Sequence, residues 1–140
     1  MEHQRRKIKV LLAQFPLETH SRGIITVAGL LRDAGMEVIL LGNALPENII
    51  KAAVQEYVDV VGISTYTGGE LALGGELLKV AEKEGIKEHT IFVLGGIFPL
   101  KDEPKLKEMG FSGAFLSATK EEIVSSIKSA VASKRLSSSA

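Results

Sequence analysis

The chain has 140 residues, of which 45% are hydrophobic, and this is enough to bury the core of one globular domain. Its 17 basic and 17 acidic residues give a net charge of zero, so we predict neither a nucleic-acid partner nor a membrane partner. Cysteine is absent, which excludes disulfides, thiolate metal sites and a cysteine nucleophile and favours a cytoplasmic location.

The two ends of the chain are polar and flank this domain. Residues 1–7 are basic, and the apolar run over 8–13 that follows is too short for a signal peptide or a membrane span. The last seven residues are small and polar, which is typical of a disordered tail. We therefore predict an N-terminal extension over 1–7, a ligand-binding domain over 8–133 and a tail over 134–140.

Between the ends, short runs rich in Val, Ile and Leu alternate with segments of helical periodicity. Gly35, Gly85 and Gly110 follow three of the predicted helices, where a left-handed residue is common, and Pro46 suits the first turn of another. The predicted elements in chain order are a strand over 9–13, a helix over 23–34, a strand over 37–41, a helix over 46–56, a strand over 58–63, a helix over 69–84, a strand over 90–94, a helix over 101–109, a strand over 114–116 and a helix over 120–133.

This alternation predicts an α/β fold with a parallel sheet and crossover helices on both faces. Right-handed crossovers favour a flavodoxin-like sheet of order 2-1-3-4-5 over half of a Rossmann fold. In such sheets, ligands bind beyond the carboxyl ends of the strands, near the switch point between strands one and three. The loops at that edge are therefore the place to look for function.

Three of these loops carry residues suited to binding a metal-containing cofactor. His20, in the loop after strand one, can donate a lone pair to a transition metal. Glu18 can accept the other ring N–H and so fix the imidazole. Ser64 follows strand three, and the pair Gly95-Gly96 follows strand four. We predict that these residues meet at one edge of the sheet.

The segment over 11–23 resembles the cobalamin-binding loop of methylmalonyl-CoA mutase and related acyl-CoA mutases. That family has the pattern Asp-x-His-x-x-Gly, matched here by Glu18, His20 and Gly23. The family continues with Ser-x-Leu after strand three, matched by Ser64-Thr65-Tyr66, and with a Gly-Gly after strand four. The resemblance extends over about 8–131 and identifies the domain over 8–133 as a cobalamin-binding domain.

The resemblance implies that His20 is the lower ligand of the cobalt, replacing the cofactor's own dimethylbenzimidazole. It also implies that the nucleotide tail enters a slot beside the sheet, where Ser64 bonds the tail and Gly95-Gly96 let the backbone approach it. The cofactor-binding residues expected from it are Glu18, His20, Ser21, Arg22, Gly23, Ser64, Tyr66, Gly68, Gly95, Gly96, Ser117 and Thr119.

The family further implies adenosylcobalamin as the cofactor and a radical rearrangement of the carbon skeleton of an acyl-CoA. The barrel that holds the acyl-CoA in this family has no counterpart in the chain, so the resemblance implies the small subunit of a heteromeric mutase and a large barrel-type partner. Four positions depart from the family pattern: Gln14 in place of lysine, Glu18 in place of aspartate, Tyr66 in place of leucine, and Leu116 within a segment that is often Gly-Pro-Gly-Thr.

Two other functions remain open for this sequence, a corrinoid methyl carrier and a non-catalytic descendant of the cobalamin domain. A response regulator would need an acceptor aspartate where the chain has Ser64, and a flavodoxin would need a Ser/Thr-rich phosphate loop after strand one. Nucleotide hydrolysis is disfavoured, because the glycines near Gly68 are not followed by the lysine of a phosphate-binding loop.

Overall fold

The computed structural model describes residues 6–16, 18, 22–65, 69–115 and 119–139. Within them, strands and helices alternate along the chain, and the strands form a parallel sheet of order β2-β1-β3-β4-β5. This order confirms the flavodoxin-like prediction. The elements are β1 (Lys9–Gln14), α2 (Arg22–Asp33), β2 (Glu37–Asn43), α3 (Pro46–Glu56), β3 (Val60–Thr65), α4 (Glu70–Lys83), β4 (Ile91–Gly96), the 3-10 helix η1 (Leu100–Asp102), α5 (Glu103–Met109), β5 (Gly113–Phe115) and α6 (Lys120–Ser139).

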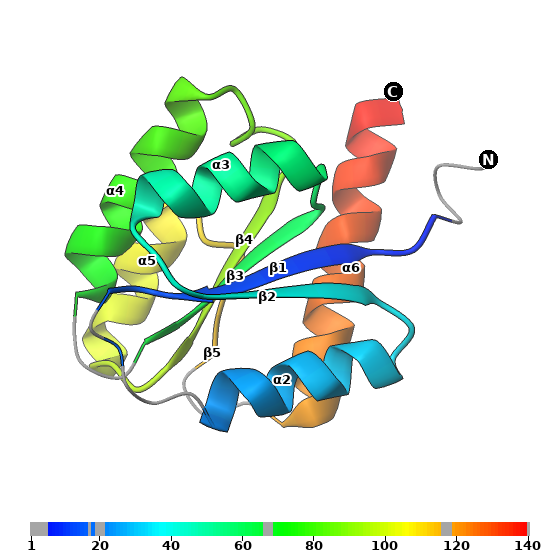
Figure 1. Cartoon of the computed structure of the whole chain (residues 1–140), viewed down its shortest axis with the longest axis horizontal. Coiled ribbons are helices and arrows are strands. Elements are labelled where there is room, and N and C mark those ends of the chain that lie inside the picture. The colour runs from blue at the N-terminus through cyan, green and yellow to red at the C-terminus, as the bar shows by residue number, and fades with distance from the viewer. Residues whose placement is uncertain (1–5, 17, 19–21, 66–68, 116–118, 140) are drawn as a thin grey trace.

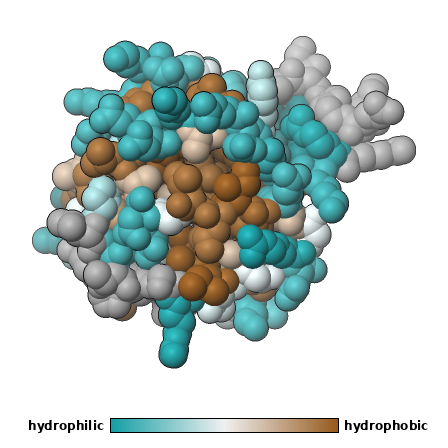
Figure 2. Space-filling model, viewed as in Figure 1, coloured by the Kyte–Doolittle hydropathy of each residue, from teal (hydrophilic) through white to brown (hydrophobic). Residues whose placement is uncertain are grey.

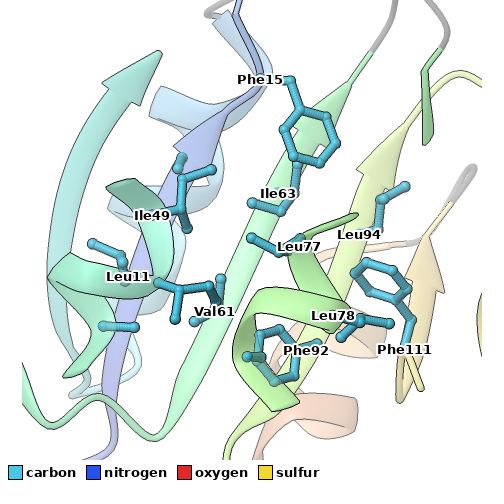
Figure 3. Close-up of a cluster of buried hydrophobic side chains, with 14 of the residues drawn as sticks. Leu11, Phe15, Ile49, Val61, Ile63, Leu77, Leu78, Phe92, Leu94 and Phe111 are labelled. Carbon is cyan, nitrogen blue, oxygen red and sulfur yellow. The ribbon is translucent and has the colours of Figure 1, made fainter. Parts of the chain in front are cut away.

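Helices cover both faces of the sheet (Figure 1). Helices α3, α4 and α5 lie on one face, and α2 and α6 lie on the other. Side chains of each strand alternate between the two faces, so the core divides into two apolar clusters. Figure 3 shows the cluster under α3 and α4, in which Phe15 lies at the end nearest the carboxyl edge of the sheet and Phe92 lies toward the opposite end.

The backbone confirms the glycines and the proline that the sequence predicted at the ends of helices. Gly35, Gly85 and Gly110 have φ angles of 89°, 78° and 132°, values that side chains rarely permit. Pro46 is at the start of α3, where its missing N–H costs no helical hydrogen bond. Glycine and proline thus mark the ends of helices as their conformational preferences predict.

Helix α6 is longer than the sequence predicted. It continues to Ser139, through the segment that was expected to be a disordered tail. Arg135 lies 3.5 Å from the Asp59 carboxylate and donates a hydrogen bond to the backbone oxygen of Arg6. Lys134 donates to the backbone oxygen of Glu88. These contacts with distant segments hold the last turns of the helix, and local composition cannot reveal them.

The edge strand β2 leaves apolar side chains at the surface. Leu40 and Leu41 are 40% and 38% exposed, and Figure 2 shows an apolar area over β2, between α3 and α2. The backbone of this edge is partly covered, because Arg32 donates to the backbone oxygen of Val38. Among the described residues, none of the helices has the length and hydrophobicity required to cross a bilayer.

Candidate functional site

The predicted switch point is built from one row of residues that crosses the sheet near its carboxyl edge. Gln14 of β1 pairs in register with Asn43 of β2 on one side and with Ser64 of β3 on the other. Ser64 pairs with Gly95 of β4, and Gly95 pairs with Phe115 of β5. Ser64 and Gly95, which the sequence placed at one edge, are therefore direct neighbours.

This row has a defined face. Side chains at positions two or four apart on a strand point to the same side of the sheet. The residues that precede Gln14, Ser64 and Gly95 by two or four positions belong to the apolar cluster under α2 and α6; they are Leu12, Val60 and Val93. The polar groups of Gln14 and Ser64 thus lie at the carboxyl end of the α2/α6 face, and both side chains are buried.

The loop after β1 is fixed by Asn43, the last residue of β2. The Asn43 Nδ2 atom donates to the backbone oxygens of Phe15, at 3.0 Å, and of Glu18, at 2.7 Å. The Glu18 N–H in turn donates to the Phe15 oxygen, and the Glu18 residue is only 4% exposed. Asn43 therefore holds the chain just before the predicted cobalt ligand, with Glu18 packed inside the protein.

Asn43 is not among the site residues that the sequence predicted. Its position at the end of the second strand was a signal that could have found it, because an amide at that edge can bond the neighbouring loop. Its partner could not have been deduced, since Phe15 and Asn43 are 28 residues apart and meet only through the pairing of β1 with β2.

The two glycines after Leu94 have different reasons to be glycine. A β-carbon on Gly96 would lie 1.8 Å from the Thr65 oxygen, and its φ angle is 136°, so the fold itself requires a glycine there. A β-carbon on Gly95 would meet the Phe115 oxygen at 3.6 Å and the Phe115 β-carbon at 3.9 Å, which are ordinary contacts. As far as the described residues go, there is room for a methyl group at Gly95, on the same face as Ser64.

The remaining predicted residues divide into described and undescribed ones. Arg22 and Gly23 form the first turn of α2, with Arg22 exposed. Thr119 caps α6, because its Oγ1 atom accepts a hydrogen bond from the Glu122 N–H at 3.2 Å. The other predicted residues lie outside the described part of the chain; they are His20, Ser21, Tyr66, Gly68 and Ser117.

The fold defines an α/β domain of flavodoxin-like topology, with polar residues and a glycine in register at its switch point, where such folds bind ligands. Comparison with protein families shows which kind of flavodoxin-like domain this is. The model of the B12 binding domain matches residues 8–127, and the chain belongs to that family.

Its relatives include separate small subunits of mutases. The 2-hydroxyisobutanoyl-CoA mutase small subunit of Aquincola tertiaricarbonis is 37% identical over 129 residues, which are 91% of this chain and 94% of that protein. The pivalyl-CoA mutase small subunit of Xanthobacter autotrophicus is 37% identical over 85% of this chain and 80% of its own length. Methylmalonyl-CoA mutase of Escherichia coli is 32% identical, and there the chain corresponds to only 15% of the protein.

Solved structures share the fold with much less sequence identity. A cobalamin-binding protein from Desulfitobacterium hafniense superimposes with a TM-score of 0.74 at 19% identity, covering 86% of this chain and 57% of that one. A signal receiver domain from Vibrio parahaemolyticus reaches the same TM-score at 11% identity, covering 95% and 96% of the two chains. Backbone shape therefore does not separate cobalamin domains from receiver domains, and the residues at the site must do so.

The residues at this edge fit a cobalamin. Gly95 leaves space that none of the described residues fills, and Ser64 provides a buried hydroxyl beside it. Gln14 adds an amide in the same row. A sheet edge with a glycine and a few hydrogen-bonding groups suits the long, polar nucleotide tail of the cofactor.

Proposed function

We propose that the chain is the cobalamin-binding small subunit of a heteromeric acyl-CoA mutase. The observation that carries this proposal is the row of Gln14, Ser64 and Gly95 on the α2/α6 face, which lies beside a loop held by Asn43. Family membership and the size of the two small-subunit relatives support it, because this chain spans nearly all of one and most of the other.

We propose His20 as the lower ligand of the cobalt. Chain connectivity supports this role, since His20 is two residues from Glu18, which Asn43 holds, and two residues from Arg22, which begins α2. Two residues span at most about 7 Å of backbone, so the positions of Glu18 and Arg22 limit where the backbone of His20 can lie. Glu18 is proposed to accept the second ring N–H and to hold the neutral tautomer that ligates a metal.

In the proposed complex, the tail of the cofactor lies between the sheet and helices α2 and α6. Ser64 would hydrogen-bond the tail, with Gly95 lining the slot. Tyr66, Gly68 and Ser117 are proposed to contribute to the same site and lie outside the described residues. The cofactor, proposed to be adenosylcobalamin, supplies a cobalt–carbon bond that breaks homolytically. The chain itself binds and orients the corrin, and a large barrel-type subunit is proposed to hold the acyl-CoA.

The test is reconstitution of the purified 140-residue chain with cobalamin, followed by visible absorption spectroscopy. We expect the wild type to bind the cofactor in a histidine-ligated form and His20→Ala to lose that form. His89→Ala is the matched control, because His89 is exposed and precedes β4 at the opposite edge of the sheet. Failure of the wild type to bind cobalamin, or an unchanged spectrum in His20→Ala, would refute the proposal.

The mutase assignment needs a second measurement, because a methyl carrier would also bind cobalamin. Acyl-CoA isomerisation should appear only when the loaded chain is combined with a large barrel-type subunit. Methyl transfer from the loaded chain to a methyltransferase, with no isomerisation, would favour the carrier instead.

A further inference from the structure

A pocket of about 500 Å³ lies at the amino edge of the sheet, at the opposite end of the strands from Ser64 and Gly95. Its walls come from the end of α3, the start of β3, the turn between α4 and β4, and the last turns of α6. Figure 1 shows the end of α3 and the last turns of α6 at this same end of the strands. Because a strand of the length of β3 spans about 20 Å, the pocket is separate from the proposed cobalamin site.

The pocket is lined by residues from both apolar clusters of the core. Ala53, Val58 and Ile86 belong to the cluster under α3 and α4, and Ile91 and Val131 belong to the cluster under α2 and α6. Ligand pockets typically have volumes of about 300–1,000 Å³ and a mainly apolar lining with a few charged or polar groups. The size and lining of this pocket therefore suit the apolar part of a small organic molecule.

Ionic contacts around Asp59 fix one side of the pocket. The Asp59 carboxylate lies 3.0 Å from the guanidinium group of Arg6 and 3.5 Å from that of Arg135. It also accepts a hydrogen bond from the Lys9 backbone N–H at 2.9 Å. The negative charge of Asp59 is therefore compensated within the protein, and the last turns of α6 are held at the amino edge as a wall of the pocket.

The lining of the pocket has an excess of positive charge. Three cationic side chains and two anionic ones line it, which gives a net charge of +1. Lys134, one of the cations, donates a hydrogen bond to the backbone oxygen of Glu88, and this bond fixes the ammonium group. An ammonium group has three N–H donors, so Lys134 can also bond a ligand. This charge and these donors suit a carboxylate, phosphate or sulfonate group.

Tyr57, the residue that follows α3, lines the pocket in an unfavourable backbone conformation. Its φ angle of 53° is the only positive value among the described residues other than glycine. Glycine adopts this conformation more easily and is common at the end of a helix. Tyr57 is 89% exposed, so its ring contributes little to the packing of the core. A ring held at a strained position without a role in packing indicates a role in binding.

We propose that this pocket is a second ligand site, which binds an organic anion with an aromatic body. The aromatic body packs against Val58 and Ile86, and the Tyr57 ring covers its open side. Lys134 and Arg6 pair with the anionic group. The site does not depend on the proposed function, because its residues lie at the edge of the sheet away from the proposed cofactor site.

The experiment titrates the full chain with two fluorescent probes. Anilinonaphthalenesulfonate is an aromatic monoanion whose fluorescence rises in an apolar site, and phenylnaphthylamine has the same aromatic body without the charge. Lys134→Gln should weaken binding of the sulfonate about tenfold, the change expected for loss of one charge-assisted hydrogen bond, and should leave binding of the neutral probe unchanged. Lys128→Gln is the matched control, because Lys128 is exposed on the same helix outside the pocket, and it should bind both probes as the wild type does.

Substitutions of Tyr57 separate a role in binding from a role in folding. Tyr57→Gly should weaken binding of both probes severalfold, because the ring contact is lost, while the thermal midpoint of the protein rises. Tyr57→Phe keeps the ring and should bind both probes as the wild type does. Weaker binding by a more stable variant cannot result from damage to the fold.

Three results would overturn the proposed site. The first is probe binding that neither Tyr57→Gly nor Lys134→Gln weakens. The second is loss of binding in Leu41→Gln, which would place the probes on the apolar area over β2. The third is displacement of the probes by cobalamin, which would place them at the carboxyl edge. If the chain binds no cobalamin, the proposed function fails, and the two sets of variants still decide the second site.

Discussion

Substitution of Gly96 by alanine tests how closely the strands approach at the carboxyl edge. The new β-carbon would lie 1.8 Å from the Thr65 oxygen, a backbone atom paired within the sheet that cannot move aside cheaply. Overpacking of this kind costs about 1–3 kcal/mol. The φ angle of 136° adds backbone strain of about 1–3 kcal/mol for a residue with a side chain. Together these give a loss of about 2–6 kcal/mol, a large share of the roughly 5–15 kcal/mol that stabilises a typical domain.

Gly95→Ala is the matched variant, with the opposite expectation. Its β-carbon would make an ordinary contact of 3.6 Å with the Phe115 oxygen, and its φ is not in the region that favours glycine. We expect less than about 1 kcal/mol of destabilisation, but weaker cobalamin binding, because the methyl group enters the proposed slot.

The assay for both variants is urea unfolding followed by circular dichroism, together with cobalamin titration of the variants that fold. Equal stabilities of Gly95→Ala and Gly96→Ala would refute the geometric reasoning. Unimpaired cobalamin binding by Gly95→Ala would show that the slot does not run along this face.

Three further substitutions test other contacts. Asn43→Ala removes two hydrogen bonds to the loop after β1, so it should lower the free energy of unfolding in urea by about 1–3 kcal/mol and weaken cobalamin binding. Asn48→Ala, at an exposed position on α3, is the control and should change neither quantity. Thr119→Ala removes the cap of α6 and should lower the free energy of unfolding by about 1 kcal/mol, and Thr119→Ser should restore it; equal stability of the two variants contradicts a capping role. Tyr57→Gly should raise the midpoint of thermal unfolding. Tyr57 is 89% exposed at a φ of 53°, and a residue with a side chain in this left-handed conformation destabilises the fold by about 1 kcal/mol relative to glycine. A lower midpoint would mean that the tyrosine ring has a structural role.

Local sequence determined much of this protein. The alternation of apolar runs and helical segments predicted each strand and helix to within a few residues, apart from the end of α6. This prediction succeeded because burial of one face of a helix or strand makes apolar residues recur at a fixed spacing. It also succeeded because the backbone preferences of Gly35 and Pro46 do not depend on distant contacts. The order of the sheet followed from the handedness of the crossovers.

Resemblance at particular residues determined the family. The loop around His20, together with Ser64 and Gly95-Gly96, indicated a cobalamin domain, and the family match over 8–127 confirmed it. Backbone shape could not have made this distinction, since a receiver domain superimposes as well as a cobalamin-binding protein does.

Tertiary structure alone decided how the site is supported. The bonds from Asn43 to the loop after β1 and the different demands on Gly95 and Gly96 both involve residues that are distant in sequence. Each depends on strand register or on the packing of helices, which place atoms within a few tenths of an ångström. Sequence periodicity defines which face of an element is buried, but it carries no information about which distant polar group that face will meet.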